Sequence, residues 1–326
     1  MPPSPTTGLA VAGGLHLRNR HHGHYDFPRL VAVYSGLSRF VIPHPDGGDT
    51  VDFFDPAAVI ALNRALLMAD YGLLFWDLPP GALCPPIPGR VDYLHHVADL
   101  LAEDRGAGRK TDEKVRVLDI GMGANCIYPI LGAGEYGWRF VGTDTDAGSV
   151  AWAKKLVAAN PSLKDRIECR HQHLADDIFA GAVRETERFT VSVCNPPFHA
   201  SAAEAEAGTV RKLRNLDERR TAEEQPILNF GGRSNELWCA GGEVGFVRRM
   251  IVQSAARPEQ CRWFTTLVSK RASLPAIERA LHTAQAADVR IIPMTHGQKH
   301  SRIVAWRFLR RSEEPGKPRG MIRRPM

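Results

Sequence analysis

The stretch VRVLDIGMGANCIYPI, residues 115–130, is the most informative part of the sequence for the fold. Residues 115–120 have the composition of a buried β-strand, and Gly121 and Gly123 form a turn that leads into a short helix over residues 124–131. A strand, a glycine turn and a helix in this order allow a ligand to approach the backbone beyond the carboxyl end of the strand. The stretch therefore indicates an α/β nucleotide-binding fold, although dinucleotide enzymes begin in the same way.

Two features of this stretch favour a methyltransferase over a dinucleotide-binding enzyme. The third glycine of the G-x-G-x-x-G pattern is absent, because Cys126 occupies its position. Asp119 precedes the first glycine, as is usual in methyltransferases, where such an acid holds the amino-acid end of the cofactor directly or through water. A tight turn in some other α/β protein remains the alternative at this point.

Strand-like and helix-like segments alternate around this stretch, which predicts a largely parallel sheet covered by helices on both faces. We expect strands at residues 115–120, 139–144, 166–170, 189–194, 261–268, 289–294 and 303–309, the last two forming an antiparallel pair around the loop THGQKHS. We expect helices at residues 124–131, 147–159, 175–184 and 274–284. The predicted fold class is thus α/β, with the Rossmann-like seven-stranded sheet and terminal antiparallel hairpin of class I S-adenosylmethionine-dependent methyltransferases.

Four segments are expected along the chain. They are a disordered basic leader (residues 1–24), an N-terminal helical extension packed on the core (25–110), the methyltransferase domain (111–310) and a basic tail (311–326). Residues 52–104 are largely helical in pattern, broken by the proline-rich stretch WDLPPGALCPPIPGR. A polar insert near residues 202–224 interrupts the domain, and a loop of that length is usually functional or disordered.

The composition excludes several classes of protein. No apolar run approaches the length of a membrane span, so no membrane partner is expected. The six cysteines are scattered without a C-x-x-C pair, and no histidine pattern has metal-ligand spacing. We therefore expect no metal and no disulfides, and the cytoplasm is the expected compartment.

Positive charge is concentrated near both ends of the chain. The net charge of +6 permits a polyanionic partner without requiring one. Residues 16–29 carry three arginines and four histidines against one acid, and the tail from Arg310 carries six Lys or Arg against two Glu. These segments favour contacts with phosphate, although solubilising termini are the alternative.

The end of the strand at residues 139–144 carries a carboxylate suited to a nucleoside. Asp144 stands at this end, where it can accept hydrogen bonds from both ribose hydroxyls. This role fits S-adenosylmethionine and NAD equally well. Asp146 is expected to cap the following helix.

The motif Asn195-Pro196-Pro197-Phe198 directly follows the strand at residues 189–194 and is the most specific chemical signal. An exocyclic amine on a purine is a poor nucleophile, because its lone pair is delocalised into the ring. The Asn195 side-chain oxygen and the Pro196 carbonyl can accept its two N–H hydrogens and orient the nitrogen toward a methyl sulfonium. The two prolines fix the backbone, and Phe198 offers a face on which an extruded base can stack.

The chain resembles the bacterial family of 23S rRNA adenine-N6 methyltransferases called ribosomal RNA large subunit methyltransferase F, and it is similar to the eukaryotic relative that methylates U6 snRNA. The resemblance runs from about Tyr25 to Leu309. It rests on HYDFPRL, DFFDPAAVIALNRALL, PPIPGRVDYLHHVADLL, LDIGMGANCIYPILG, NPPFHAS and NFGGRSNELWCAGGEVGFVRRM. Most of these stretches lie outside the generic methyltransferase motifs, so they indicate the family and not only the fold. The resemblance implies S-adenosyl-L-methionine as cofactor and 23S rRNA, or a large-subunit precursor, as partner.

The resemblance also implies which residues hold the cofactor. They are Arg90 for its carboxylate, Gly121 for its methionine part, Asp144 for its ribose, Gln172 to Leu174 for its adenine end, and Asn195 beside both the cofactor and the target amine. A guanidinium fork such as that of Arg90 suits a carboxylate. The family tends to have lysine where His173 stands, which puts the role of that position in doubt.

The glycine-rich stretch NFGGRSNELWCAGGEVGFV predicts a substrate-facing loop that becomes helical at about Gly242. In this loop Arg233 would bind phosphate, Trp238 would stack on a base, and Glu236 or Glu243 would accept hydrogen bonds. An ordinary loop that caps the next helix is the alternative. No general base is assigned, because the methylated ammonium product loses its proton easily, and His199 suits a packing role equally well.

Other functions remain as alternatives to methylation of RNA. The same catalyst could act on an adenine of DNA or on the amide of a protein glutamine, but the chain has no separate target-recognition domain and its ends are basic. The missing third glycine disfavours an NAD-dependent oxidoreductase. Asp119 and Asn195 disfavour a non-catalytic RNA-binding protein.

Overall fold

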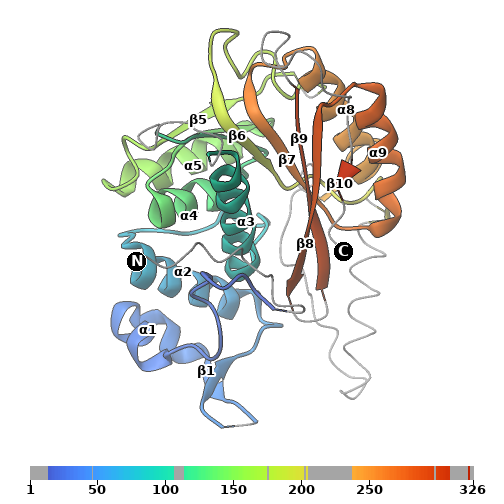
Figure 1. Ribbon diagram of the computed structural model, residues 1–326. Helices are drawn as coiled ribbons and strands as arrows, with labels where there is room; N and C mark the ends of the chain where they lie inside the picture. The colour runs from blue at the N-terminus through green and yellow to red at the C-terminus, as the bar shows by residue number, and fades with distance from the viewer. Residues whose placement is uncertain are drawn as a thin grey trace, which may run out of the picture.

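A largely parallel β-sheet forms the centre of the computed structural model (Figure 1), which describes residues 14–45, 47–105, 114–174, 176–201, 203–204, 237–296, 299–308 and 322–323. Its strands lie in the order β10-β8-β9-β7-β6-β3-β4-β5. They are β3 (Arg116–Ile120), β4 (Arg139–Asp144), β5 (Ile167–His171), β6 (Phe189–Cys194), β7 (Cys261–Val268), β8 (Asp288–His296), β9 (Lys299–Arg307) and the short β10 (Ile322–Arg323). Strands β3 to β7 are parallel, whereas β9 is antiparallel to both β7 and β8. The class I methyltransferase sheet with its terminal hairpin is confirmed, and β10 adds to it.

The order of the strands creates a switch point near the middle of the sheet. The chain reaches one edge at β5 and then returns to the middle at β6, beside β3. In open α/β sheets, ligands bind beyond the carboxyl ends of the strands on either side of such a point. The fold therefore predicts a site beyond β3, β4 and β6.

Alternate residues of the strands point into two hydrophobic cores, one on each face of the sheet. In β3, Val117 lies in one core and Leu118 in the other, and Trp263 and Phe264 of β7 divide in the same way. The first core is covered by α2 (Pro56–Tyr71), α3 (Ile87–Arg105), α4 (Ile127–Tyr136) and α5 (Ala147–Ala159), and the second by α8 (Gly242–Ala255) and α9 (Leu274–Thr283). Burial on both faces explains why apolar residues stand next to one another in these strands rather than only at alternate positions.

Residues 52–104 are largely helical, as predicted, because α2 and most of α3 lie within them. The part of the chain before α3 contains α1 (Phe27–Val33), the 3-10 turn η1 (Ser35–Phe40), a hairpin of β1 (Val41–Pro43) and β2 (Asp49–Val51), and α2. Helix α2 begins at Asp55, whose side chain accepts from the Ala57 N–H, and it ends at Gly72 in the left-handed conformation. The hairpin was not expected from the sequence.

Residues 14–24 were expected to belong to a disordered leader, and the structure contradicts this. The His16 N–H donates to Asp92 Oδ1 at 2.6 Å, and the His16 ring nitrogen lies 2.8 Å from Asp99. Arg18 forms an ion pair with the same Asp99 at 2.6 Å. This segment, called the N-terminal strap below, therefore lies along α3, and its positive charges have partners within the protein.

The helix expected at residues 175–184 is also wrong, because residues 176–188 form turns and bends. Gly181 has a φ of +83°, a conformation that does not continue a helix. The Arg184 N–H donates to the Glu187 carboxylate, which in turn pairs with Arg170 of β5 at 2.6 Å. These contacts hold the segment as a loop against the edge of the sheet.

Two other elements differ in extent from the prediction. The helix expected at residues 124–131 is α4, which begins three residues later because Cys126 adopts a left-handed φ of 51°. The terminal hairpin is longer than expected, since β8 runs to His296 and β9 starts at Lys299.

Other features concern only the part of the chain that the structure describes. There, no helix is long and apolar enough to span a membrane. Nor does any group of three or more His, Cys, Asp or Glu in these residues have an arrangement that could hold a metal ion. The polar insert and the basic tail lie outside the described residues, apart from residues 203–204 and 322–323.

Candidate functional site

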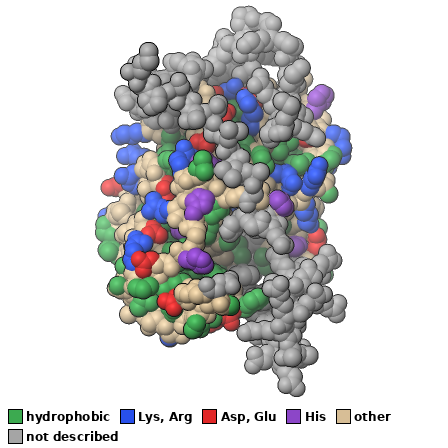
Figure 2. Space-filling view, turned by 60° about the horizontal axis from the view of Figure 1, so that its bottom comes forward, with side chains coloured by type: hydrophobic (Ala, Val, Ile, Leu, Met, Phe, Trp, Pro, Cys, Tyr) green, Lys and Arg blue, Asp and Glu red, His purple; other side chains and the backbone are tan. Residues whose placement is uncertain are grey.

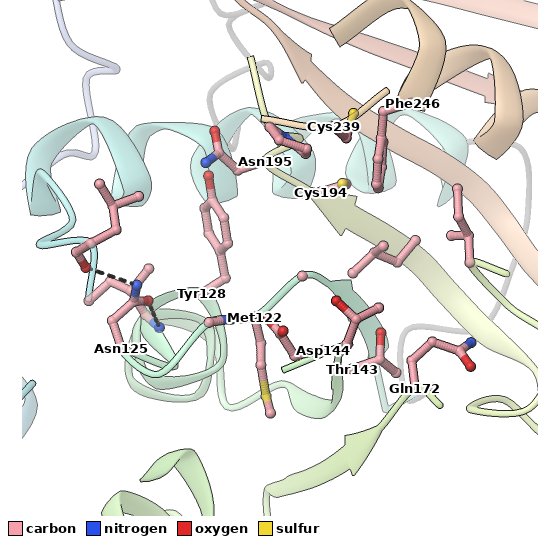
Figure 3. A pocket seen from close by; sticks show the side chains of 18 of the residues that line it. Met122, Asn125, Tyr128, Thr143, Asp144, Gln172, Cys194, Asn195, Cys239 and Phe246 are labelled. Atoms are coloured by element: carbon pink, nitrogen blue, oxygen red, sulfur yellow. Dashed lines mark hydrogen bonds between the residues drawn. The ribbon is translucent and has the colours of Figure 1, made fainter. Parts of the chain in front are cut away.

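A pocket opens at the carboxyl ends of β3, β4 and β6, at the switch point of the sheet. In Figure 3, one side of the pocket carries Cys194, Asn195, Cys239 and Phe246, and the other carries Met122, Thr143, Asp144 and Gln172. The predicted site residues that line it are Arg90, Gly121, Gly123, Asp144, Gln172, Asn195, Pro197 and Trp238. Those that do not line it are Asp119, His173, Pro196 and Phe198. Arg233 lies outside the described residues.

Hydrogen bonds tie the glycine turn to the end of β4. Gly121 and Gly123 have φ angles of +73° and +63°, which glycine adopts without strain. The Gly121 N–H donates to the Thr143 carbonyl at 2.9 Å. The Asp144 carboxylate accepts from the N–H groups of Gly123 and Asp146, both at 2.9 Å. Burial raises the pKa of Asp144 although these N–H groups oppose the rise. Asp144 is therefore a fixed acceptor on the pocket wall, and Asp146 caps α5 as predicted.

The polar side chains of Arg90, Tyr128 and Asp119 lie close together beside the turn. Arg90 of α3 donates to the Tyr128 hydroxyl of α4 at 2.8 Å, and its Nε has no partner among the described residues. Asp119 is completely buried, and neither carboxyl oxygen has a partner there. Burial and, to a smaller degree, the Asp144 carboxylate raise the pKa of Asp119 well above its usual value, although Arg90 opposes this. Unpartnered buried polar atoms are costly, so this arrangement suits a polar ligand.

These groups match the polar parts of S-adenosylmethionine. The Arg90 guanidinium suits the methionine carboxylate, and the Asp144 carboxylate suits the ribose hydroxyls. Asp119 lies behind the pocket wall, so it can act on the methionine ammonium through its charge or through water. The residues present therefore fit this cofactor.

The loop after β5 contributes Gln172 to the pocket and leaves His173 outside it. The Gln172 amide donates to the Ala180 carbonyl at 2.6 Å and accepts from the Leu174 N–H at 3.1 Å. Its side chain therefore holds the loop in place. His173 is exposed and lies edge-on to His171, with ring centroids 4.2 Å apart.

The Asn-Pro-Pro-Phe motif presents one unsatisfied acceptor at the pocket. Asn195 Oδ1 is buried and has no hydrogen-bond partner among the described residues. Pro196 and Pro197 are buried, whereas Phe198 is half-buried and lies outside the lining residues. The Asn195 oxygen is therefore in place to accept an N–H group, whereas the ring of Phe198 is not in place to stack on a base in the pocket.

The predicted substrate-facing loop runs beside this motif. His199 and Trp238 form a parallel bridge, in which the His199 N–H donates to the Leu237 carbonyl at 3.1 Å and the Cys239 N–H to the His199 carbonyl at 3.0 Å. Glycine at position 242 permits this approach, since a Cβ there would lie 3.2 Å from the Ala200 nitrogen. Trp238 reaches the pocket through this pairing, and α8 begins at Gly242 as predicted.

Sequence reasoning missed Phe246 and Arg249, which line the pocket from α8. Their spacing of three residues on a helix that follows a glycine-rich loop was the available signal. The expected role of Glu243 as a substrate acceptor is wrong, because its buried carboxylate accepts from the N–H and the hydroxyl of Ser269, both at 2.6 Å. Glu243 thus joins α8 to the end of β7, and Glu236 lies outside the described residues.

Known sequences match the chain over most of its length. A family model described as RNA methyltransferase matches residues 9–310. The chain is 55% identical over 296 residues to the ribosomal RNA large subunit methyltransferase F of Aeromonas salmonicida, which covers 91% of this chain and 92% of that protein. It is 52% identical over 299 residues to the protein of the same name from Pseudomonas savastanoi pv. phaseolicola, with 92% and 91% covered.

Solved structures of METTL16 have a similar fold. The hMettl16 catalytic domain in complex with MAT2A 3′UTR hairpin 1 has a TM-score of 0.76 and 30% identity, covering 94% of this chain and 100% of that chain. The N-terminal domain of human METTL16 in complex with SAH has a TM-score of 0.71 and 28% identity, covering 91% and 100%. The similarity thus extends over the extension as well as the sheet.

Proposed function

The chain belongs to the RNA methyltransferase family, together with the ribosomal RNA large subunit methyltransferases F, and we propose that it methylates the N6 amine of an adenine in 23S rRNA. It is an enzyme that uses S-adenosylmethionine. The name of its relatives supports a large-subunit ribosomal RNA as substrate. The proposal places the reaction in the cytoplasm, on free 23S rRNA or on a precursor particle. The RNA hairpin held by the similar METTL16 domain supports an adenosine presented in a folded RNA.

The observation that carries the proposal is the buried, unpartnered Oδ1 of Asn195. This oxygen and the Pro196 carbonyl accept the two N–H hydrogens of the target amine, which turns the nitrogen lone pair toward the methyl group. S-adenosylmethionine supplies an electrophilic methyl group on a sulfonium. As the nitrogen forms its bond to carbon, the carbon–sulfur bond breaks, and the excess proton on nitrogen leaves to solvent. The motif therefore contributes orientation and acceptors rather than a base.

Three other side chains are assigned to the cofactor by this proposal. Arg90 anchors its carboxylate, Asp119 balances the charge of its ammonium, and Asp144 accepts from its ribose. Phe246, on the Asn195 side of the pocket in Figure 3, and Trp238, which lines the pocket and pairs with His199, supply aromatic surface for the base. The face that is turned forward in Figure 2 carries Lys, Arg and His side chains with fewer Asp and Glu side chains among them, which suits a polyanionic substrate.

The test is a methylation assay with labelled S-adenosylmethionine. The purified protein is offered 23S rRNA, large-subunit particles depleted of this modification, DNA oligonucleotides and a glutamine-containing peptide. We expect N6-methyladenosine at one position of 23S rRNA, identified by nuclease mapping and mass spectrometry. Methylation confined to DNA or peptide, or at another atom of the RNA, would overturn the proposal.

A further inference from the structure

Arg249 places a cation on the substrate side of the pocket. It follows Phe246 by one helical turn on α8, and its guanidinium carbon lies 5.9 Å from the centre of the Phe246 ring. Burial raises the pKa of the Cys239 thiol and Arg249 opposes this rise, so the guanidinium lies near that thiol, which also lines the pocket. Phe246 and Cys239 lie with Asn195 on the same side of the pocket (Figure 3), so the guanidinium belongs to that side as well.

The charge of Arg249 has no anion to balance it among the described residues. No carboxylate there forms an ion pair with it, and its Nε is buried without a hydrogen-bond partner. A thiol is a weak acceptor and leaves most of the guanidinium donors unused. A half-buried cation without a counter-charge favours the binding of an anion.

The cofactor does not provide that anion once its own groups are assigned. Its single carboxylate is matched by Arg90, which lies with Tyr128 and Asp119 beside the glycine turn. Its ammonium and its ribose require acceptors, which a guanidinium is not. Arg249 therefore remains for an anion that the other substrate brings.

We infer that Arg249 binds a backbone phosphate of the RNA next to the target adenosine. With the amine edge of the adenine at Asn195, the sugar and phosphate extend away from the motif, along the wall that holds Phe246 and Cys239. A guanidinium fork donates two parallel hydrogen bonds to phosphate and favours it over a water molecule. Arg249 is thus a substrate-binding residue that fixes how deep the nucleotide enters. The inference rests on the proposed function, because it requires RNA as the substrate.

The experiment compares Arg249→Met and Arg249→Lys with Arg248→Met. Arg248 is the neighbouring residue on α8, carries the same charge, is exposed and does not line the pocket, so it is a matched control. The substrate is an RNA fragment around the adenine mapped in the methylation assay. We expect Arg249→Met to raise the KM for this RNA roughly 10- to 100-fold. Arg249→Lys should recover part of the loss, and Arg248→Met should stay within about twofold of the wild type.

A second arm replaces single phosphates beside the target adenosine with neutral methylphosphonates. One replacement should impair the wild-type enzyme as much as Arg249→Met does, and it should cause no further loss in that variant. Binding of SAH, measured by calorimetry, should be unchanged.

Three results would overturn the inference. The first is an active enzyme whose KM for the RNA is unchanged in Arg249→Met. The second is a loss of SAH binding in Arg249→Met, which would place the residue at the cofactor. The third is equal sensitivity of variant and wild type to every neutral linkage. If the wild-type enzyme methylates no RNA, the proposed function fails instead.

Discussion

The hydroxyl of Tyr93 lies 2.7 Å from Oγ1 of Thr265 and binds the chain immediately before the Asn-Pro-Pro-Phe motif. The Thr265 hydroxyl donates to the Ser192 carbonyl at 2.6 Å, so the Tyr93 hydroxyl must donate to Thr265. It also accepts from the Cys194 N–H at 3.3 Å. Tyr93 is fully buried on α3, so the helical extension fixes the backbone that carries Asn195.

Tyr93→Phe should therefore lower stability and slow methyl transfer together. Losing the hydroxyl leaves the Cys194 N–H and the Thr265 oxygen short of a partner, which should lower the free energy of unfolding by about 1–3 kcal/mol. Methyl transfer at saturating substrates should fall several-fold, with little change in SAH affinity. Chemical denaturation and single-turnover assays on the same samples measure both effects.

Tyr136→Phe is the control for this variant. The Tyr136 hydroxyl lies 2.6 Å from the His95 ring nitrogen, between α4 and α3, and neither residue lines the pocket. We expect it to reduce stability without slowing methyl transfer. Equal turnover in Tyr93→Phe and the wild type would show that the hydroxyl only packs the core.

The sequence predicted those parts of the site whose function requires a particular run of adjacent residues. Gly121 and Gly123 need left-handed backbone next to a strand, and the Asn195 motif needs consecutive prolines, so both are visible in a few adjacent letters. The contact between Tyr93 and Thr265 joins positions 172 residues apart, and no local pattern contains it. Arg249 is likewise identified by what surrounds it in space.

The failed predictions have the same origin. Residues 175–184 have apolar spacing compatible with a helix. The left-handed φ of Gly181, the bond from the Arg184 N–H to Glu187 and the pairing of Glu187 with Arg170 of β5 hold them as a loop instead. Residues 14–24 were predicted to belong to a disordered leader, and their positive charge was assigned to contacts with phosphate. Their carboxylate partners lie on α3 and α4, more than 70 residues along the chain.

Asp119 should make the stability of the cofactor-free protein depend on pH. Its pKa is raised in the folded state, so its contribution to stability is complete below about pH 4 and is lost as the pH rises through the raised value. Asp119→Asn cannot ionise. The stability of this variant relative to the wild type should increase with pH, by roughly 1–3 kcal/mol, while its affinity for SAH falls about tenfold or more. Thermal unfolding across a pH series and calorimetry test the two halves.

Asp99→Asn should show the opposite trend. Burial opposes ionisation of Asp99, but hydrogen bonds from His16 and Arg18 outweigh it and lower its pKa. Its contribution to stability is therefore present above about pH 4 and is lost as the pH falls through the lowered value. If Asp119→Asn and Asp99→Asn followed the same pH trend, the charge assignment at Asp119 would be wrong.

Removing the N-terminal strap should destabilise the fold rather than only weaken RNA binding. Besides its bonds to Asp92 and Asp99, the strap forms the ion pair of Arg20 with Glu135 at 2.8 Å, and Asn19 donates to the Pro88 carbonyl at 2.9 Å. Deletion of residues 1–24 should cost about 2–4 kcal/mol relative to deletion of residues 1–13. Denaturant titration of the two truncations measures this difference. Equal midpoints would mean that these contacts contribute nothing.

Asn195→Ala should reduce turnover while leaving the cofactor site intact. The Asn195 oxygen is buried and unpartnered, so an N–H of the target amine gains an acceptor whose importance is greatest while the nitrogen rehybridises. We expect methyl transfer to fall roughly 100-fold or more, as for the loss of one transition-state hydrogen bond. SAH should still bind, because Arg90, Gly123 and Asp144 come from α3, the glycine turn and β4.

Asn195→Asp gives the sharper form of this test, because it keeps the oxygen and the shape and adds a charge. If Asn195 acts as an acceptor, the aspartate variant should retain more activity than the alanine variant when its carboxylate is ionised. If the side chain served only the turn, both variants would methylate 23S rRNA at the wild-type rate.

Phe198→Ala separates stacking of the target base from the acceptor role of Asn195. Phe198 does not line the pocket in this structure. If its ring moves onto the base when RNA binds, Phe198→Ala should weaken RNA binding by about 1–3 kcal/mol. Full RNA affinity in Phe198→Ala would assign the stacking surface to Trp238 and Phe246, which line the pocket already.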